Sequence, residues 1–379
     1  MTLNRRTFLA GAGSLTLLGS PLISARASQL KKRNLVVVML RGGMDGLTAV
    51  PPKDKLLQSA RPDIIVKGTI SLNSDFALHP KLETFYELWK ANQAAIFHAT
   101  NIPYVNRSHF EGQDLMESGG HTPYGESTGW LGRGMEAAEL QGLSVSLPMP
   151  LLLRGGINPD NYFPTRMRLP DQALMQRVAA TYPEGSSLND AMQRVLHRPM
   201  SMMQRVDDRD ALSLAGTAAD ELAKEDGPRV AVFDLNGFDT HAAQGGEDGE
   251  HGEMLSKFDG IVRILRNRMG DEFNNTLVVS LTEFGRKLEQ NGGYGTEHGY
   301  GTAVLMAGGL VKSAKVHADW PGLASKNLYD GQDLNATIDA RSIYCAAMAA
   351  CFDVDFRYIR KHAFWDETLS DVTESLFRV

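Results

Sequence analysis

The chain has 379 residues, of which 42% are hydrophobic and 22% are charged, and its formal net charge is −6. This composition is typical of a globular protein with a large core, and it gives no reason to expect nucleic-acid binding, which usually needs a basic surface. The only cysteines, Cys345 and Cys351, are too few for a disulfide-stapled secreted domain, so we expect buried free thiols.

The first 27 residues have the parts of a bacterial signal peptide in the expected order. A paired arginine at 5–6 precedes an uncharged run at 9–23, and residues 25–27 have the small-x-small form of a cleavage site. The run is shorter than the roughly 20 apolar residues of a membrane anchor. We therefore predict a twin-arginine signal peptide over 1–27, recognised by the twin-arginine translocation machinery, and a periplasmic or secreted protein with no membrane span in its mature part. The alternative is a cytosolic protein with a chance arginine pair.

Strands and helices alternate along most of the remaining chain. Apolar runs fit buried strands and amphipathic segments fit helices, in the order strand 35–40, helix 81–90, strand 94–99, helix 108–118, strand 230–235, helix 253–269, strand 275–281, strand 302–307 and helix 339–352. This order predicts an α/β fold with a mostly parallel central sheet and helices on both faces. We expect residues 28–379 to form one domain. An inserted helical subdomain around 155–225 is an alternative compatible with the sequence.

Four polar clusters lie next to predicted strands, and open parallel sheets bind their ligands beyond the carboxyl ends of the strands. Carboxylates combined with imidazoles suit zinc, manganese or iron. The sequence therefore predicts a divalent metal site whose candidate ligands are Asp45, Asp239, His241, Glu283 and His298.

Each candidate also has a purely structural interpretation. Asp45 is in a glycine-rich turn where Asp is common, and Asp239 fits a helix cap. Glu283 and Arg286 fit an ion pair, and His298 fits a hydrogen-bonded loop histidine. Only the convergence of all the clusters at one edge favours a shared site.

Five segments resemble the markers of one family, in the right order and over essentially the whole mature chain. They are Arg-Gly-Gly-Met-Asp-Gly at 41–46, Arg-Ser-His-Phe at 107–110, Gly-Phe-Asp-Thr-His-Ala-Ala-Gln at 237–244, Thr-Glu-Phe-Gly-Arg at 282–286 and Gly-Thr-Glu-His-Gly at 295–299. The family is the exported bacterial one catalogued as domain of unknown function 1501, itself similar to the alkaline phosphatase and sulfatase superfamily. The resemblance implies an alkaline phosphatase-like three-layer α/β sandwich.

The superfamily places one or two divalent metals beside a nucleophile at a helix start, and Ser108 matches that place. A helix N-terminus favours an anion there. The resemblance then gives Arg107 or Arg286 the role of steadying an anionic ester substrate, and His109 the role of orienting it or moving a proton. Two departures, the Glu283-Phe284 pair and the short spacing between Asp239 and His241, leave one metal or none as alternatives to two.

The residues and the resemblance together are compatible with two functions. The first is a metal-dependent hydrolase of phosphate or sulfate esters. The second is a non-catalytic exported protein that binds a glycan or a protein. Ser108 also has two interpretations, as the nucleophile or as an N-cap whose capping box is completed by Glu111.

Overall fold

The computed structural model describes residues 32–146, 149–156, 159–163, 171–197, 210–366 and 368–378. The predicted leader therefore lies outside the described residues. In the described part of the chain, no helix combines the length and hydropathy needed to cross a membrane.

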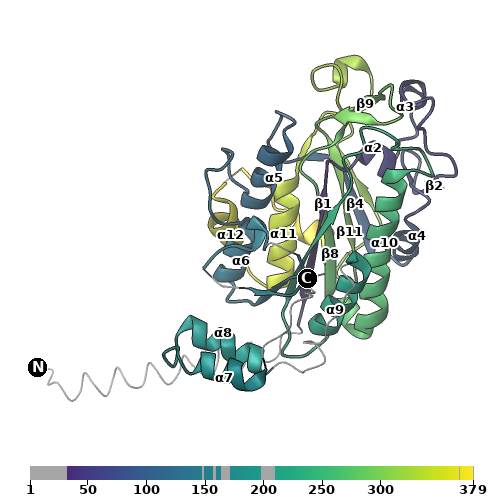
Figure 1. The fold of residues 1–379 in the computed structure, drawn as a ribbon. Coiled ribbons are helices and arrows are strands. Elements are labelled where there is room, and N and C mark those ends of the chain that lie inside the picture. The colour runs from purple at the N-terminus through teal and green to yellow at the C-terminus, as the bar shows by residue number, and fades with distance from the viewer. Residues whose placement is uncertain are drawn as a thin grey trace, which may run out of the picture.

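A nine-stranded sheet forms the centre of the molecule (Figure 1), in the order β12-β4-β11-β8-β1-β7-β5-β6, with β13 paired to β4. Its strands are β1 (Asn34–Arg41), β4 (Ala94–Asn101), β5 (Gly142–Ser144), β6 (Asp160–Asn161), β7 (Val230–Asn236), β8 (Thr276–Leu281), β11 (Thr302–Ala307), β12 (Val316–His317) and β13 (Ile338–Asp339). Two small hairpins lie apart from it, β2 (Ile70–Ser71) with β3 (Ala77–Leu78), and β9 (Arg286–Gln290) with β10 (Thr296–His298).

The sheet is mostly parallel, as predicted, with one exception that matters for the site. β1 runs parallel to β7 and to β8, whereas β11 runs antiparallel to both of its neighbours, β8 and β4. The beginning of β11 therefore lies at the same sheet edge as the ends of β1, β7 and β8. As a result, the loop that precedes β11 reaches the edge where the other polar clusters follow their strands.

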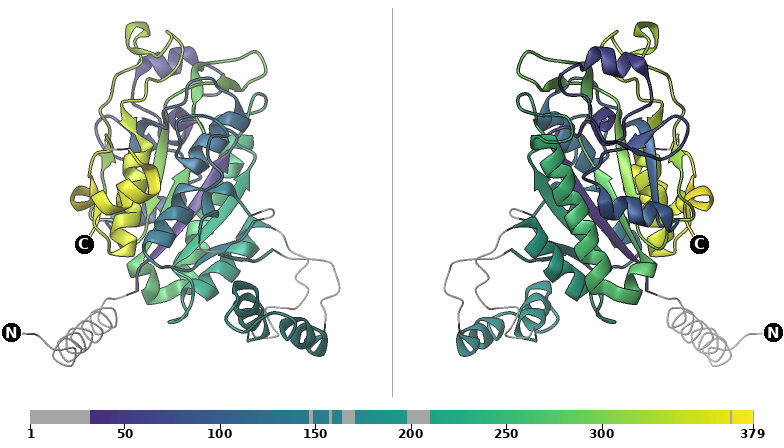
Figure 2. Two further views of the ribbon diagram at one scale, coloured as in Figure 1. Left: turned by 90° about the vertical axis from the view of Figure 1, so that its left-hand side faces the viewer. Right: turned by 90° about the vertical axis from the view of Figure 1, so that its right-hand side faces the viewer.

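Helices cover both faces of the sheet (Figures 1 and 2), which gives the predicted three layers. They are α2 (Gly46–Ala49), α3 (Lys55–Ala60), α4 (Glu83–Lys90), α5 (His109–Ser118), α6 (Trp130–Ala137), α7 (Gln172–Ala179), α8 (Ser187–Leu196), α9 (Ala211–Leu222), α10 (Glu250–Met269), α11 (Ala340–Phe352), α12 (Phe356–Ile359) and α13 (Thr373–Leu376). Shorter turns are the 3-10 segments η1 (Leu151–Leu153), η3 (Gly270–Asn275) and η4 (Ser325–Asn327) and the π-helical η5 (Arg360–Phe364).

The alternation of side chains along β1 divides the core in two. Leu35, Val37 and Met39 pack with α5, α6 and α11 on one face. Val36 and its alternate neighbours pack with α4, α9 and α10 on the other face. Because both faces of β1 are covered, every residue from 34 to 40 is buried, which explains the continuous apolar run in the sequence.

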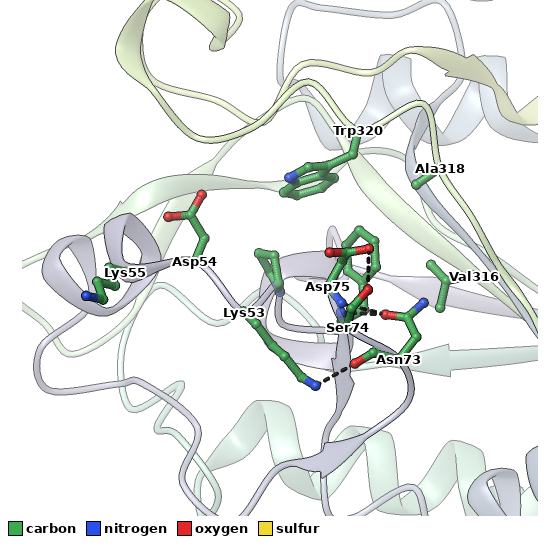
Figure 3. A pocket seen from close by; sticks show the side chains of 11 residues that line it. Lys53, Asp54, Lys55, Asn73, Ser74, Asp75, Val316, Ala318 and Trp320 are labelled. Carbon is green, nitrogen blue, oxygen red and sulfur yellow. Dashed lines mark hydrogen bonds between the residues drawn. The ribbon is translucent and has the colours of Figure 1, made fainter.

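The two cysteines are buried free thiols on α11, as predicted. In the region around 155–225, α9 packs against α10 as part of a core layer, whereas α7 and α8 pack mainly on each other. A separate open hollow lies beside the edge strand β12 and is lined by residues from three distant segments (Figure 3).

Candidate metal centre

The polar clusters meet at the carboxyl edge of the sheet. A glycine turn leaves β1 with Gly42 at a φ of 116°, and a Cβ there would lie 2.3 Å from the backbone nitrogen of Asp239. Glycine is needed because a side chain has no room in this backbone conformation. The close approach brings the loop after β7 against the end of β1, next to the first turn of α5.

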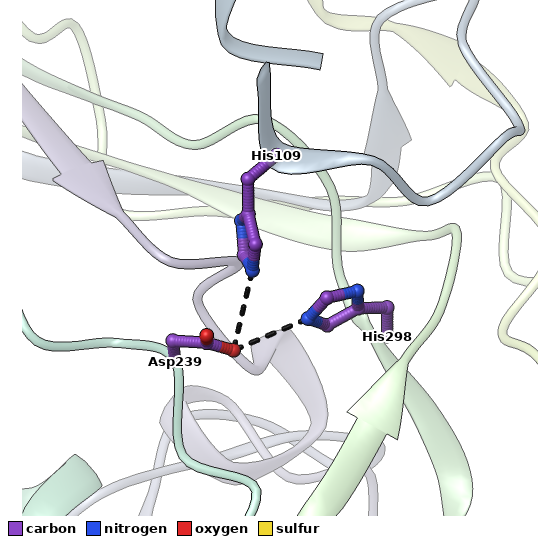
Figure 4. A group of neighbouring side chains, drawn as sticks. All are labelled: His109, Asp239 and His298. Atoms are coloured by element: carbon purple, nitrogen blue, oxygen red, sulfur yellow. Dashed lines mark hydrogen bonds and ion pairs between the residues drawn. The ribbon is translucent and has the colours of Figure 1, made fainter. Parts of the chain in front are cut away.

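Three imidazoles surround one carboxylate oxygen. The Oδ1 atom of Asp239 lies 3.3 Å from Nε2 of His109, 3.2 Å from Nε2 of His241 and 3.2 Å from Nε2 of His298. The Nε2 atoms of His241 and His298 are 2.9 Å apart. Figure 4 shows His109 and His298 both pointing at Asp239 from different segments. These four side chains are called the His-Asp cluster below.

The other ring nitrogen of each histidine has its own acceptor. Nδ1 of His109 lies 2.9 Å from Oε1 of Glu283, and Nδ1 of His241 lies 3.1 Å from Oε2 of Glu297. Nδ1 of His298 lies 2.9 Å from the carbonyl oxygen of Arg107. Because these oxygens only accept, each Nδ1 is placed to donate a hydrogen, and in that tautomer Nε2 is the nitrogen that faces the cluster with a free lone pair. Such outer acceptors are typical of metal-binding histidines.

The spacing of the cluster fits a metal ion. Ligand bonds of about 2.0–2.1 Å in a tetrahedron place the ligand atoms about 3.3 Å apart, close to the distances around Asp239. Nε2 of His109 is buried and has no hydrogen-bond partner in the described part of the chain, although it is 3.3 Å from Asp239. In the tautomer with hydrogen on Nδ1, the Nε2 lone pairs lie close to one another and to a carboxylate and repel, and a cation between them would relieve that repulsion.

Burial and neighbouring groups shift the pKa values of the cluster residues. Burial opposes ionisation of Asp239, but the hydrogen bond and the positive charge of Arg286 outweigh it and lower the pKa of Asp239 to about 2. Burial lowers the pKa of His298, which favours the neutral imidazole that a metal requires. The hydrogen bond to Glu283 raises the pKa of His109, so at this position protons compete with a metal.

The cluster is walled on one side and open on the other. The ring of Phe284, which is buried, lies 4.9 Å from the ring of His109 and 4.8 Å from that of His298. The side chains of Asp239 and His241 are 47% and 38% exposed. A ligand from solvent can therefore approach the cluster from the side of these two residues.

Of the five predicted metal ligands, three belong to the cluster: Asp239, His241 and His298. Glu283 lies one step further out. Its buried carboxylate accepts hydrogen bonds from His109, from the backbone of Gly42 at 2.9 Å and from Gln113 at 2.8 Å. It therefore orients His109 and does not face the centre.

Asp45 is committed to a different partner. Its carboxylate is fully buried and lies 2.5 Å from Nη1 of Arg61, which is itself 1% exposed. It also accepts hydrogen bonds from Thr48 at 2.8 Å, from Gln244 at 2.7 Å and from the backbone of Leu47 at 3.1 Å. The guanidinium compensates the charge that a metal would otherwise compensate, and these interactions lower the pKa of Asp45 to about 2 against the opposing effect of burial.

The predicted catalytic residues all lie near the cluster, in differing roles. Ser108 occupies the N-cap position of α5, but its hydroxyl makes no cap hydrogen bond. The predicted capping box is wrong, because the carboxylate of Glu111 accepts from the Tyr104 hydroxyl at 2.9 Å and that hydroxyl accepts from the backbone of Ser108. The first turn of α5 therefore has no side-chain cap.

Neither predicted arginine is directed at an open anion site. The guanidinium of Arg107 binds Asp333, with Nε 3.1 Å from Oδ2, while its backbone carbonyl holds His298. Arg286 is fully buried; it donates to Oδ1 of Asp239 at 2.7 Å and to backbone carbonyls, among them that of Gly43 at 2.8 Å. Both residues position the cluster.

Sequence reasoning missed some of these partners. It gave His109 the role of orienting the substrate or moving a proton, and did not place it among the metal donors. Arg61 and Gln244, which enclose Asp45, had no local signal. Glu297 was part of the Glu-His pair but was not given the role of orienting His241.

The chain belongs to the family described as protein of unknown function (DUF1501), whose model matches residues 32–344. No curated protein matches the sequence.

Several solved structures are similar to the chain at low identity. Ps i-CgsB is 13% identical, with a TM-score of 0.44, covering 86% of this chain and 73% of that one. The C-terminal periplasmic domain of EcEptC from Escherichia coli is 10% identical, with a TM-score of 0.41 and coverages of 90% and 88%. A mutant of the alkaline phosphatase PafA is 12% identical, with a TM-score of 0.36 and coverages of 70% and 65%.

Proposed function

We propose that this chain is an exported hydrolase of phosphate or sulfate esters that uses one divalent metal ion. The observation that carries the proposal is the convergence of three Nε2 atoms on Oδ1 of Asp239, with each imidazole fixed through its Nδ1. His109, Asp239, His241 and His298 would hold the ion. Three nitrogens and one oxygen suit zinc best, with iron or manganese as the alternatives.

Two features favour one ion over two. Asp45, another of the predicted metal ligands, is neutralised by Arg61 in a fully buried pair. Phe284 presents an apolar ring beside the cluster where a second set of ligands would be needed. A bound divalent ion supplies a Lewis acid that polarises the ester oxygen and lowers the pKa of the nucleophile.

Ser108 is the proposed nucleophile. It precedes the metal-facing His109 directly, its hydroxyl is not used for capping, and it is partly exposed. The uncapped N–H groups in the first turn of α5, together with the helix dipole, would bind the anionic oxygens of the ester. His109 would be fixed by Glu283, and Arg107 would fix His298 through its carbonyl group. The chain thus offers a nucleophile, an anion-binding helix end and oriented metal donors at one place.

One observation favours the alternative of a non-catalytic binding protein. If His241 joins His109, Asp239 and His298, the ion has four protein donors, and zinc sites that are closed in this way are usually structural. The exposure of Asp239 and His241 argues for an additional open position. The two functions differ in whether the metal-loaded protein turns over an ester.

The test is hydrolysis by protein purified after native export and loaded with zinc, manganese or iron. The substrates are p-nitrophenyl phosphate, bis-p-nitrophenyl phosphate and p-nitrophenyl sulfate. We expect turnover of at least one ester, its loss in His298→Ala, and no change in the matched control His197→Ala, which removes an exposed histidine at the end of α8. Metal-loaded protein that hydrolyses none of the three would contradict the proposed activity.

The proposed location is the periplasm or the outside of the cell, reached through the twin-arginine pathway. The support is the paired arginine and the cleavage pattern of residues 1–27. This route exports proteins that have already folded, and it suits a protein that would acquire its metal before export.

A further inference from the structure

We infer that the hollow beside β12 is a binding site for the ring of a neutral sugar, built from residues that have no part in the His-Asp cluster. The hollow has a volume of about 640 Å³, within the roughly 300–1,000 Å³ typical of ligand sites. Three segments form it: residues 52–55, which lead into α3, residues 73–76 in the turn between β2 and β3, and residues 316–320 at and after β12 (Figure 3).

Trp320 provides a rigid aromatic surface. Its indole packs perpendicular to the rings of Phe76, at 5.1 Å and 87°, and His98, at 5.0 Å and 79°. Phe76 and His98 stack on each other and are both buried. Figure 3 shows the indole lying across the hollow on the side opposite Lys53 and Asp75. An aromatic ring held in this way can pack against the C–H face of a sugar ring with little loss of side-chain entropy.

The turn opposite Trp320 fixes an amide donor. Oδ1 of Asn73 accepts hydrogen bonds from the backbone N–H groups of Asp75 and Phe76, both at 2.8 Å. The amide nitrogen makes no hydrogen bond in the described part of the chain. Since the oxygen is fixed, the position of the amide N–H groups is fixed as well, and they remain for a ligand hydroxyl.

Two carboxylates supply acceptors. Asp54 uses Oδ1 to cap α3 at the backbone of Leu56, at 2.9 Å, which leaves Oδ2. Asp75 uses Oδ2 to accept from the hydroxyl of Ser74 at 3.0 Å, which leaves Oδ1. Sugar hydroxyls both donate and accept, so they match a rim with acceptors and donors together.

The charge of the hollow selects for a neutral ligand. Lys53 and Lys55 balance Asp54 and Asp75 in the lining. The ammonium group of Lys53 is also tied to the turn, through the hydroxyl of Ser71 at 2.8 Å and the carbonyl of Asn73. A polyanion gains nothing from such a surface, whereas a neutral ring with many hydroxyls satisfies the polar groups and covers the indole.

The test is calorimetric titration of the full mature protein with maltohexaose, cellohexaose, xylohexaose and N-acetylchitohexaose. We expect at least one of these to bind, and Trp320→Ala to weaken its binding at least tenfold. Asn73→Asp keeps the acceptor oxygen that holds the turn but replaces the amide donors, so we expect it to weaken binding severalfold. Trp365→Ala, which removes an indole that is 49% exposed elsewhere, should leave binding unchanged.

Other outcomes overturn the inference. They are the failure of all four oligosaccharides to bind, or unchanged binding in both Trp320→Ala and Asn73→Asp. Loss of sugar binding on metal removal or in His298→Ala would place the sugar at the His-Asp cluster and also refute the separate site. Because Trp320 packs on buried rings, melting curves check that its variant is folded, and Asn73→Asp tests the site without disturbing that packing.

Discussion

Replacing Glu283 with glutamine tests whether the buried carboxylate acts on the metal through His109. The change keeps the shape of the side chain and one oxygen for the donors at 2.8–2.9 Å, namely His109, Gln113 and the backbone of Gly42. It removes the negative charge that makes the imidazole a better ligand. Loss of such an outer partner typically weakens metal binding about 10–100-fold, which corresponds to about 1.4–2.7 kcal/mol.

The assay is titration of the metal-free protein with Zn²⁺ against a chromophoric chelator. Glu111→Gln is the matched control, because Glu111 lies in the same turn of α5 as His109 but its carboxylate accepts from the hydroxyl of Tyr104. We expect Glu283→Gln to raise Kd about 10–100-fold and Glu111→Gln to have little effect. If Glu283 acts through His109, adding Glu283→Gln to His109→Ala costs little more than His109→Ala alone. A Kd within about twofold of wild type, or an equal effect of Glu111→Gln, would refute the reasoning.

Three further predictions concern catalysis, export and acid stability. Ser108→Ala should abolish ester hydrolysis with unchanged metal content, and retained activity in a hydrolysis assay would exclude Ser108 as the nucleophile. The change should lower the free energy of unfolding by less than the roughly 1 kcal/mol of a lost cap, because the Ser108 hydroxyl makes no cap hydrogen bond. Arg5→Lys with Arg6→Lys should leave the unprocessed protein in the cytoplasm, and processed protein in a periplasmic fraction would show the twin-arginine assignment to be wrong. Burial lowers the pKa of His98 to about 4, so below the unfolded value of about 6.5 the unfolded state binds more protons and stability falls as pH is lowered towards 4. The free energy of unfolding, measured by urea titration at several pH values in this range, should rise with pH less steeply in His98→Gln than in wild type, by about 1.4 kcal/mol per pH unit. The same pH dependence in both proteins would contradict this.

The strands and helices that were clear in the sequence are those buried on both sides or on one regular face. The run at 35–40 is β1, whose two faces contribute to both halves of the core, and the run at 302–307 is β11. The apolar pattern alone does not predict whether a strand runs parallel or antiparallel to its neighbours. The reversal of β11 depends on its pairing with β4 and β8, and this reversal brings His298 to the same edge as Asp239.

The candidate site was predictable in part for a similar reason. Residues that follow a strand within two or three positions, such as Asp239 and Glu283, could be placed at the sheet edge from their position in the chain. The orientation of their side chains could not, because it depends on partners distant in sequence. Arg61 pairs with Asp45 from the end of α3, and His109 reaches Asp239 across 130 positions of the chain.

The most direct test of a metal ion in the His-Asp cluster is the metal content of the protein purified after native export, measured by inductively coupled plasma mass spectrometry. We predict one divalent transition metal per chain in wild type, loss of that metal in His109→Ala and His298→Ala, and retention in Asp45→Asn, since Asp45 pairs with Arg61. Folded wild-type protein without a stoichiometric metal, or with the same metal content in both histidine variants, would contradict the proposed metal centre.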